Sequence, residues 1–216
     1  MTINRREFMR AGAFTIGTAA VPAMAMAAMR TAIGSPNLSD ATIMSLSDAL
    51  DGTLILQNSY IPSFEDAARL FNSRFNPIRP LAIARCSNAA DVQRSMRWCI
   101  DNDIHFVARA GGHSYCGWSS CEGLVIDVAD LQDKSYDAGT QEVTFGSGLL
   151  LVDAYQYLGK TAQRAIPGGT CPTVGLAGLT LGGGQGMLSR QYGMTSDSLI
   201  GATVVLYDGT DVYEVT

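Results

Sequence analysis

The sequence predicts a mixed α+β fold, and three observations support this. Two short apolar runs flank an amphipathic segment between residues 81 and 108, which is the pattern of a β-α-β unit. Further strand-like runs follow, and the last two flank an Asp-Gly turn at residues 208–209. Apolar residues make up 47% and charged residues 16% of the 216 positions, which is typical of a globular chain and excludes general disorder.

The elements are expected in the following order. Residues 39–62 are polar and mixed, with one apolar stretch at 54–56, and are interpreted as a lead-in. Ser63 is expected to cap a helix that continues to Pro77. Strands are expected at 81–84 and 104–108, with a helix between them that begins at Ser87 or Asn88. The remaining elements are strands at 124–128 and 142–146, a helix at 152–162, a loop at 166–175 and a hairpin formed by 200–207 and 212–215.

The N-terminus has the pattern of an export signal. Arg5 and Arg6 precede Glu-Phe-Met, and an uncharged run rich in Ala, Gly and Thr extends from Ala11 to Met29. The paired arginines resemble a twin-arginine signal, whose pathway carries proteins already folded, often around a cofactor. The alternatives are an ordinary secretory signal or a weak membrane anchor, and Pro22 disfavours the anchor. We expect an exported protein with no stable membrane association after the signal is removed.

The charge and glycine content point toward anion binding by backbone groups. Twenty acidic and 15 basic residues give a net charge of −5, which argues against nucleic acid as a partner. Gly111 and Gly112 follow a predicted strand, and a second glycine cluster extends from Gly182 to Gly186. Loops without Cβ atoms expose successive N–H groups, which suits a pyrophosphate. The alternatives are a tight turn without ligand for the first pair and close backbone packing for the second cluster.

The cysteines allow several interpretations. Five is an odd number, so at least one thiol is free or used in other chemistry. His113, Cys116 and Cys121 could supply three ligands to zinc. The other possibilities are a disulfide between Cys116 and Cys121, or free thiols with His113 held by hydrogen bonds. Cys171 lies in a turn-rich loop that presents its thiol, or else it is a buried cysteine.

Four motifs in this order resemble one family. They are R-A-G-G-H-S from Arg109 to Ser114, G-L-V-I-D from Gly123 to Asp127, G-T-C-P-T-V-G-x-x-G from Gly169 to Gly178, and the glycine-rich run from Gly182 to Asp197. The sequence is similar to the flavin-binding domain of berberine bridge enzyme-like oxidases, of the vanillyl-alcohol oxidase and para-cresol methylhydroxylase (PCMH) type. The resemblance implies a PCMH-type FAD-binding domain of two small α/β subdomains with the cofactor between them, and no substrate domain.

This resemblance implies the domain boundaries. Residues 1–30 would form the signal, 31–76 the lead-in and 77–216 the FAD-binding domain. Family enzymes are roughly twice this length or more, so we expect the chain to be an N-terminal fragment, and no catalytic base is identified in it.

The resemblance also implies that FAD is attached twice. His113 would bond to the methyl carbon on the benzenoid ring of the flavin, and Cys171 to the adjacent ring carbon. An imidazole and a thiolate are the side-chain nucleophiles available near neutral pH, and oxidised flavin is an electrophile. The further cofactor-binding candidates are Arg109, Ala110, Gly111, Gly112, Ser114, Thr170, Val174, Gly175, Gly178, Gly182, Gly183, Gly184, Gly186 and Val204.

Each group of candidates has an implied role. Residues 110–114 and 182–186 would donate N–H groups to the pyrophosphate, the strand containing Val204 would lie beside the adenine, and Val174 would control access of oxygen. The expected function is an exported oxidase that passes a hydride from an alcohol, sugar or similar donor to FAD, with dioxygen giving hydrogen peroxide. The partners would be a small-molecule substrate and O2. The alternatives are a non-catalytic flavin-binding fragment and an exported zinc-binding module.

Overall fold

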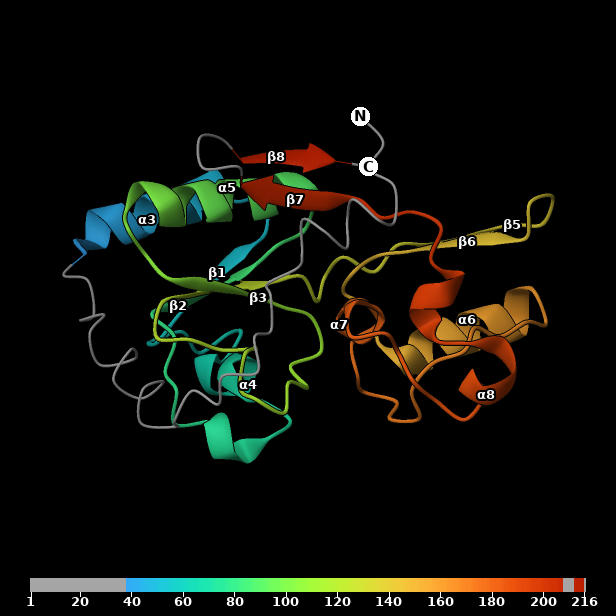
Figure 1. Ribbon diagram of the computed structural model, residues 1–216. Helices are drawn as coiled ribbons and strands as arrows, with labels where there is room; N and C mark the ends of the chain where they lie inside the picture. The colour runs from blue at the N-terminus through green and yellow to red at the C-terminus, as the bar shows by residue number, and fades with distance from the viewer. Residues whose placement is uncertain (1–37, 208–211, 216) are drawn as a thin grey trace, which may run out of the picture.

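The computed structural model describes residues 38–207 and 212–215, which form two lobes (Figure 1). The first lobe contains a four-stranded sheet in the order β1-β2-β4-β3. Its strands are β1 (Thr53–Leu56), β2 (Ala82–Arg85), β3 (Phe106–Arg109) and β4 (Leu124–Asp127). β2, β4 and β3 are parallel, and β1 is antiparallel to β2. Because of this register, the carboxyl ends of the three parallel strands meet at one edge of the sheet.

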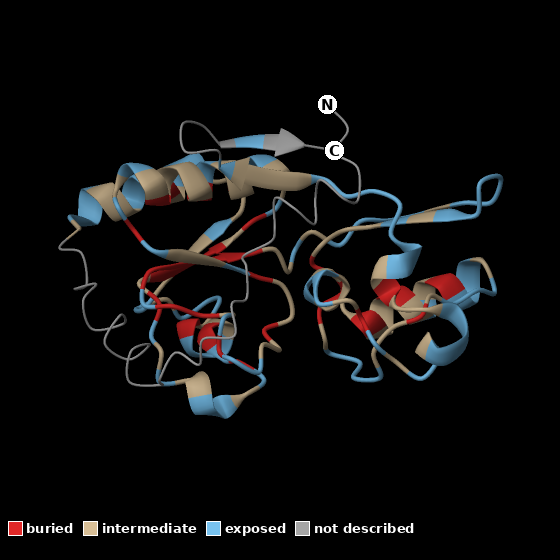
Figure 2. Ribbon diagram, viewed as in Figure 1, coloured by how far each residue is buried: buried red, intermediate tan, exposed pale blue. Residues whose placement is uncertain are grey.

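The two faces of this sheet carry different layers of helix. Ala84 and its same-face neighbours pack with Leu46 of α3 (Asp40–Ala49) and Cys99 of α5 (Ala89–Asp101). On the other face, Ile83 packs with Phe64 of α4 (Phe64–Ala68). Successive strand residues point to opposite faces, so alternate residues of β2 pack against the two helix layers. In this lobe, the buried residues lie mostly in the central strands and the helices against them (Figure 2).

The second lobe is built from the middle of the chain. It contains the hairpin β5 (Lys134–Asp137) and β6 (Glu142–Phe145), and the helices α6 (Leu151–Thr161), α7 (Leu176–Leu181) and α8 (Ser189–Tyr192). Its core is formed by Leu151, Ala154 and Leu176. Short 3-10 helices lie at Ser73–Phe75 in the first lobe and Thr195–Ser198 in the second. A hairpin of β7 (Val204–Tyr207) and β8 (Val212–Val215) then returns to the first lobe and lies against α5 (Figure 1).

Several sequence predictions are confirmed. The β-α-β unit consists of β2, α5 and β3, and Asn88 caps α5 by accepting a hydrogen bond from the Asp91 N–H at 2.9 Å. Ser63 caps α4. The predicted strands at 124–128 and 142–146 and the helix at 152–162 match β4, β6 and α6 closely. The two lobes with mixed helices and strands agree with the predicted α+β fold.

The helix that begins after Ser63 is much shorter than predicted. It ends at Ala68 rather than near Pro77. The reason is that the next N–H groups have other partners: that of Leu70 donates to Asn76 Oδ1 at 3.0 Å, and that of Phe71 to the Gly112 carbonyl at 3.3 Å. These tertiary hydrogen bonds replace the helical ones and turn the chain toward the loop after β3.

The segment interpreted as a lead-in contributes to the core. It forms α3 and β1 and buries Leu46 and Ile55. β1 extends the sheet by pairing with β2. The predicted signal in residues 1–30 and the predicted turn at 208–209 lie outside the described residues. Within the described part of the chain, no helix is both long and apolar enough to cross a membrane.

Candidate functional site

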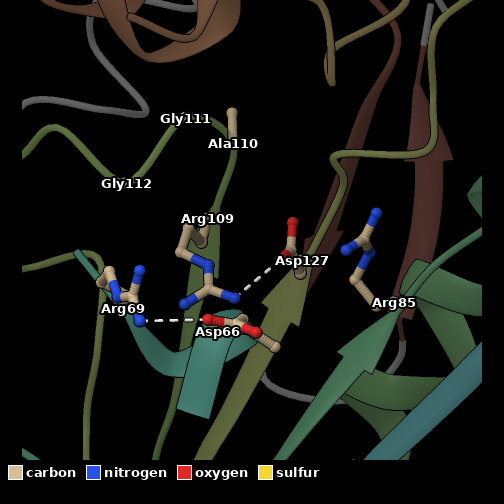
Figure 3. A pocket seen from close by; sticks show the side chains of 9 residues that line it. Asp66, Arg69, Arg85, Arg109, Ala110, Gly111, Gly112 and Asp127 are labelled. Carbon is tan, nitrogen blue, oxygen red and sulfur yellow. Dashed lines mark hydrogen bonds and ion pairs between the residues drawn. The ribbon is translucent and has the colours of Figure 1, made fainter. Parts of the chain in front are cut away.

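A cavity opens where β2, β3 and β4 end (Figure 3). It is lined by residues at the strand ends, by the end of α4 and by the loop from Ala110 to Gly112. A neighbouring groove of about 440 Å³ continues along this loop from Ala110 to His113, with Thr173 of the second lobe also on its wall. Ligands of parallel sheets usually bind outside the carboxyl ends of the strands, so this edge is the expected place for a ligand.

The loop after β3 has free N–H donors. Gly112 adopts a φ of +68°, which favours glycine. Within the described part of the chain, the N–H groups of residues 111–113 donate to no protein acceptor. Unpaired N–H groups in a turn of this kind are suited to an anion. The turn therefore has the property that the sequence predicted for a pyrophosphate-binding loop.

Arg109 supports this loop from below. Its side chain is buried, and Nη2 lies 2.7 Å from Asp127 Oδ2 on the adjacent strand (Figure 3). Nη1 is also buried and has no hydrogen-bond partner. Two further guanidinium groups line the cavity: Arg69 pairs with Asp66 at 3.0 Å, and Arg85 pairs with Asp130. Neither Arg69 nor Arg85 belongs to a motif, so nothing in the sequence predicts their position here.

The imidazole of His113 is held between two neighbours. Its Nε2 lies 3.0 Å from Thr173 Oγ1, and its ring stacks on Phe71 with centroids 4.1 Å apart and an interplanar angle of 18°. Burial lowers the pKa of His113, although a hydrogen bond to the Thr173 backbone acts in the opposite direction. The lowered pKa favours the neutral ring, which is the form that a nitrogen nucleophile requires.

The loop containing Cys171 meets the loop containing His113, although the two residues are 58 positions apart. Gly175 contacts Gly111 so closely that a Cβ at Gly111 would lie 2.3 Å from the Gly175 nitrogen. Cys171 itself is exposed, which contradicts the alternative that it is a buried cysteine. Thr173 and Phe71 were missed as site residues. Thr173 could have been found from its position two residues after Cys171 in the same motif, whereas nothing in the sequence marks Phe71.

Of the alternatives for the other cysteines, the structure agrees with free thiols and a hydrogen-bonded His113. All five thiols are free, so the disulfide considered between Cys116 and Cys121 is not formed. Cys116 is exposed, whereas Cys121 is buried with its Sγ 3.5 Å from the Leu124 carbonyl oxygen. Among the residues that the structure describes, no group of three or more His, Cys, Asp or Glu side chains could hold a metal ion. The zinc hypothesis therefore receives no support.

The second glycine cluster is closely packed, and three of its N–H groups already have protein acceptors. The N–H groups of Gly182, Gly183 and Gly186 donate to Gly178 O, Thr180 O and Ser189 Oγ. A Cβ at Gly186 would lie 1.6 Å from the Gly168 carbonyl oxygen, and one at Gly184 would lie 2.1 Å from Thr195 Oγ1. The close packing considered for this cluster is therefore present, and donation of its N–H groups to a pyrophosphate stays a prediction.

Five other candidates have different surroundings from those expected. Val204 lies in β7 against α5, on the side of the sheet away from α4, so the structure does not bring it to the cavity. Val174 packs against the core of the second lobe. Ser114 Oγ accepts from the Trp118 N–H at 3.1 Å and closes its own loop. Thr170 and Gly178 are exposed in the second lobe.

The fold and the site define a flavin-binding domain, and comparisons with known proteins agree. Residues 80–212 match the family model described as FAD binding domain. The chain is 34% identical over 151 residues to (R)-6-hydroxynicotine oxidase of Paenarthrobacter nicotinovorans, an alignment covering 69% of this chain and 32% of that protein. The chain thus belongs to the FAD-binding domain family of FAD-linked, berberine bridge enzyme-like oxidoreductases, and it spans about a third of the length of the curated relatives it matches.

Solved structures show the same relationship. Physcomitrella patens BBE-like 1 superimposes with a TM-score of 0.73 and 28% identity, covering 81% of this chain and 37% of that one. A carbohydrate oxidase from Microdochium nivale gives a TM-score of 0.71 and 29% identity over the same shares. The predicted PCMH-type FAD-binding fold is thereby confirmed.

Proposed function

We propose that this chain holds FAD covalently through His113 and Cys171, as part of an exported oxidase. The whole protein would take a hydride from an alcohol, sugar or similar small molecule and pass the electrons to dioxygen, giving hydrogen peroxide. Bound FAD supplies the hydride-accepting chemistry. The observation that carries the proposal is the contact between Gly111 and Gly175, which brings the His113 and Cys171 loops to one groove.

The residues around the groove fit the cofactor. The free N–H groups of residues 111–113 and the unpartnered Nη1 of Arg109 are donors, and a diphosphate is an acceptor. His113 is neutral and half-exposed, so a lone pair is available at neutral pH. The Cys171 thiol is exposed, so a ligand can approach it from the solvent. These residues bind and orient the group, while the apolar ring of Phe71 covers one face of the imidazole.

The names of two relatives support the substrate class. One relative is a nicotine-derivative oxidase, and another, from Gibberella zeae, is a chitooligosaccharide oxidase. Both names describe oxidation of small organic molecules.

We also propose export through the arginine pair at residues 5–6. Replacing both arginines with lysine should retain the protein in the cytoplasm in a fractionation experiment.

The test is whether flavin stays with the acid-denatured polypeptide. We expect an intact mass greater by one FAD and two cross-linked peptides, containing His113 and Cys171. His113→Ala and Cys171→Ala should each retain flavin through the other residue, and the double variant should release it. The matched controls are His105→Ala, the other histidine of the chain, and Cys116→Ala, another exposed cysteine. Complete release of flavin from the unmodified chain, or retention in the double variant, would overturn the proposal.

A further inference from the structure

The loop that carries Cys171 is attached to the start of α6 just after the cysteine. The first two N–H groups of α6 donate to this loop, that of Leu151 to the Val174 carbonyl at 2.9 Å and that of Val152 to the Pro172 carbonyl at 3.1 Å. The first N–H groups of a helix have no partner within the helix, and α6 has no capping side chain. The loop carbonyls therefore satisfy the end of α6, and α6 in return fixes the chain that follows Cys171.

The chain before Cys171 is held by a side chain from the next turn of the same helix. The Tyr155 hydroxyl donates to the Gly169 carbonyl at 2.7 Å. Gly168 passes so close to this hydroxyl that a Cβ there would lie 2.5 Å from the phenolic oxygen. Burial raises the pKa of Tyr155, so the phenol keeps its proton and remains a donor. With this hydrogen bond, α6 holds the loop on both sides of Cys171.

This double attachment matters because the Cys171 side chain is exposed and makes its own position uncertain only within narrow limits. The Sγ of a cysteine lies one rotatable bond from the backbone, so a fixed backbone restricts it to a few staggered positions. Holding a reacting atom near its partner supplies a large part of the rate of a bond-forming step. The backbone anchors of the loop therefore decide where the thiol can react.

We propose that Tyr155 is the positioning residue for attachment of the cofactor at Cys171: its hydroxyl holds the Gly169 carbonyl and thereby fixes the reach of the thiol. This inference rests on the proposed covalent attachment. In the net change, the new S–C bond replaces the S–H bond of the thiol and one C–H bond of the flavin ring. The two protons and two electrons pass to dioxygen, which becomes hydrogen peroxide. Tyr155 takes no part in that transfer, because its hydroxyl proton is bonded to the loop backbone.

Tyr155→Phe tests this role because it removes the hydroxyl and keeps the ring. The chain is purified free of flavin, FAD is added in air, and the flavin-bearing His113 and Cys171 peptides are followed by mass over time. We expect attachment at Cys171 to slow by about five- to tenfold, the effect of losing one hydrogen bond. Attachment at His113 should keep its rate, since Tyr155 does not hold that loop.

Tyr157→Phe is the matched control. It removes the same group from the same helix two residues further on, where the ring packs edge-on against Phe145. Residues two positions apart on a helix do not share a face, so this change should alter neither attachment. A general loosening of the fold by Tyr155→Phe would slow attachment at His113 as much as at Cys171. The inference predicts instead that the ratio of the two rates changes.

Hydrogen exchange in the flavin-free chain reports on the same anchor without the cofactor. The Val174 N–H donates to the Cys171 carbonyl at 3.3 Å, so its exchange rate measures how often the loop opens. Tyr155→Phe should accelerate this exchange by a similar factor, and Tyr157→Phe should leave it unchanged.

The outcomes that refute the inference differ from those that refute the proposed function. If the unmodified chain attaches FAD at Cys171 and Tyr155→Phe leaves the ratio of the two attachments unchanged, the role of Tyr155 is overturned while covalent FAD stands. If the unmodified chain attaches no flavin, the proposed attachment fails, and exchange at Val174 decides whether Tyr155 anchors the loop. Faster exchange in Tyr155→Phe then supports the anchor, and an unchanged rate overturns it.

Discussion

The contact between Gly111 and Gly175 predicts that an added methyl group would separate the two lobes at the site. In Gly111→Ala, the Cβ would lie 2.3 Å from the Gly175 nitrogen, 2.9 Å from its Cα and 3.0 Å from the Thr173 carbonyl oxygen. All three neighbours are backbone atoms, so no side-chain rotation can relieve the overlap. The Cys171 loop must move, or the turn after β3 must open.

The expected loss of stability depends on which atoms the added Cβ would overlap. Overpacking typically costs about 1–3 kcal/mol, and contacts with backbone belong at the upper end, so we expect the free energy of unfolding to fall by about 3 kcal/mol. In a protein of this size that corresponds to a decrease in Tm of roughly 6–12 °C. Because movement of the loop displaces Thr173, the variant should also lose attachment of flavin at one of the two residues.

The assay compares urea unfolding, followed by circular dichroism, with flavin retention after acid denaturation. Gly159→Ala is the matched control, because a Cβ at Gly159 on α6 meets nothing within 4 Å. Alanine in an open helical position should stabilise the fold by about 0.5–1 kcal/mol. If Gly111→Ala matched this control in stability and kept both attachments, the glycine contact would not be what joins the loops.

Three other changes test separate parts of the structure. Asp127→Asn leaves the buried Arg109 guanidinium without its anion and should cost about 3 kcal/mol in a urea titration. Burial opposes ionisation of Asp91, but hydrogen bonds that include three backbone N–H groups lower its pKa overall, so the stability it contributes is present above the unfolded pKa and lost as pH falls. Asp91→Asn should therefore flatten the loss of stability between about pH 5 and pH 3. Burial raises the pKa of Cys121 to about 11, so iodoacetamide at neutral pH should label Cys116 and leave Cys121 unlabelled in a peptide mass map.

The parts of the fold with strong local signals could be predicted from the sequence. Asn88 caps α5, and the apolar runs on either side of that helix are strands, because caps and periodicity act over a few residues. β5 was not predicted, since Lys134–Asp137 is mostly polar and exposed and shows no alternation. The placement of β4 between β2 and β3 was not predicted either, because strand order depends on pairing between distant segments.

For the site, too, only the features with a local sequence signal could be predicted. The motifs identified His113 and Cys171 and the glycines beside them, but not how the imidazole is held. Phe71 reaches His113 because tertiary hydrogen bonds end α4 early, and Thr173 reaches it from the second lobe, whose loop contacts the turn after β3. The glycine run from Gly182 had two interpretations, and only three-dimensional neighbours show that Gly186 packs on Gly168.

The residues that make the proposed double attachment possible are therefore not the two nucleophiles alone. An imidazole and a thiol in loops 58 positions apart can serve one ligand only if the loop backbones approach within contact distance. Gly111 and Gly175 permit that approach because neither carries a Cβ, and each would overlap the other if it did. The contact is mutual, so a substitution at either position should push apart the loops that carry the two proposed nucleophiles. Exchange of His113 or Cys171, by contrast, would remove one of the two proposed bonds and leave the loop geometry for the other.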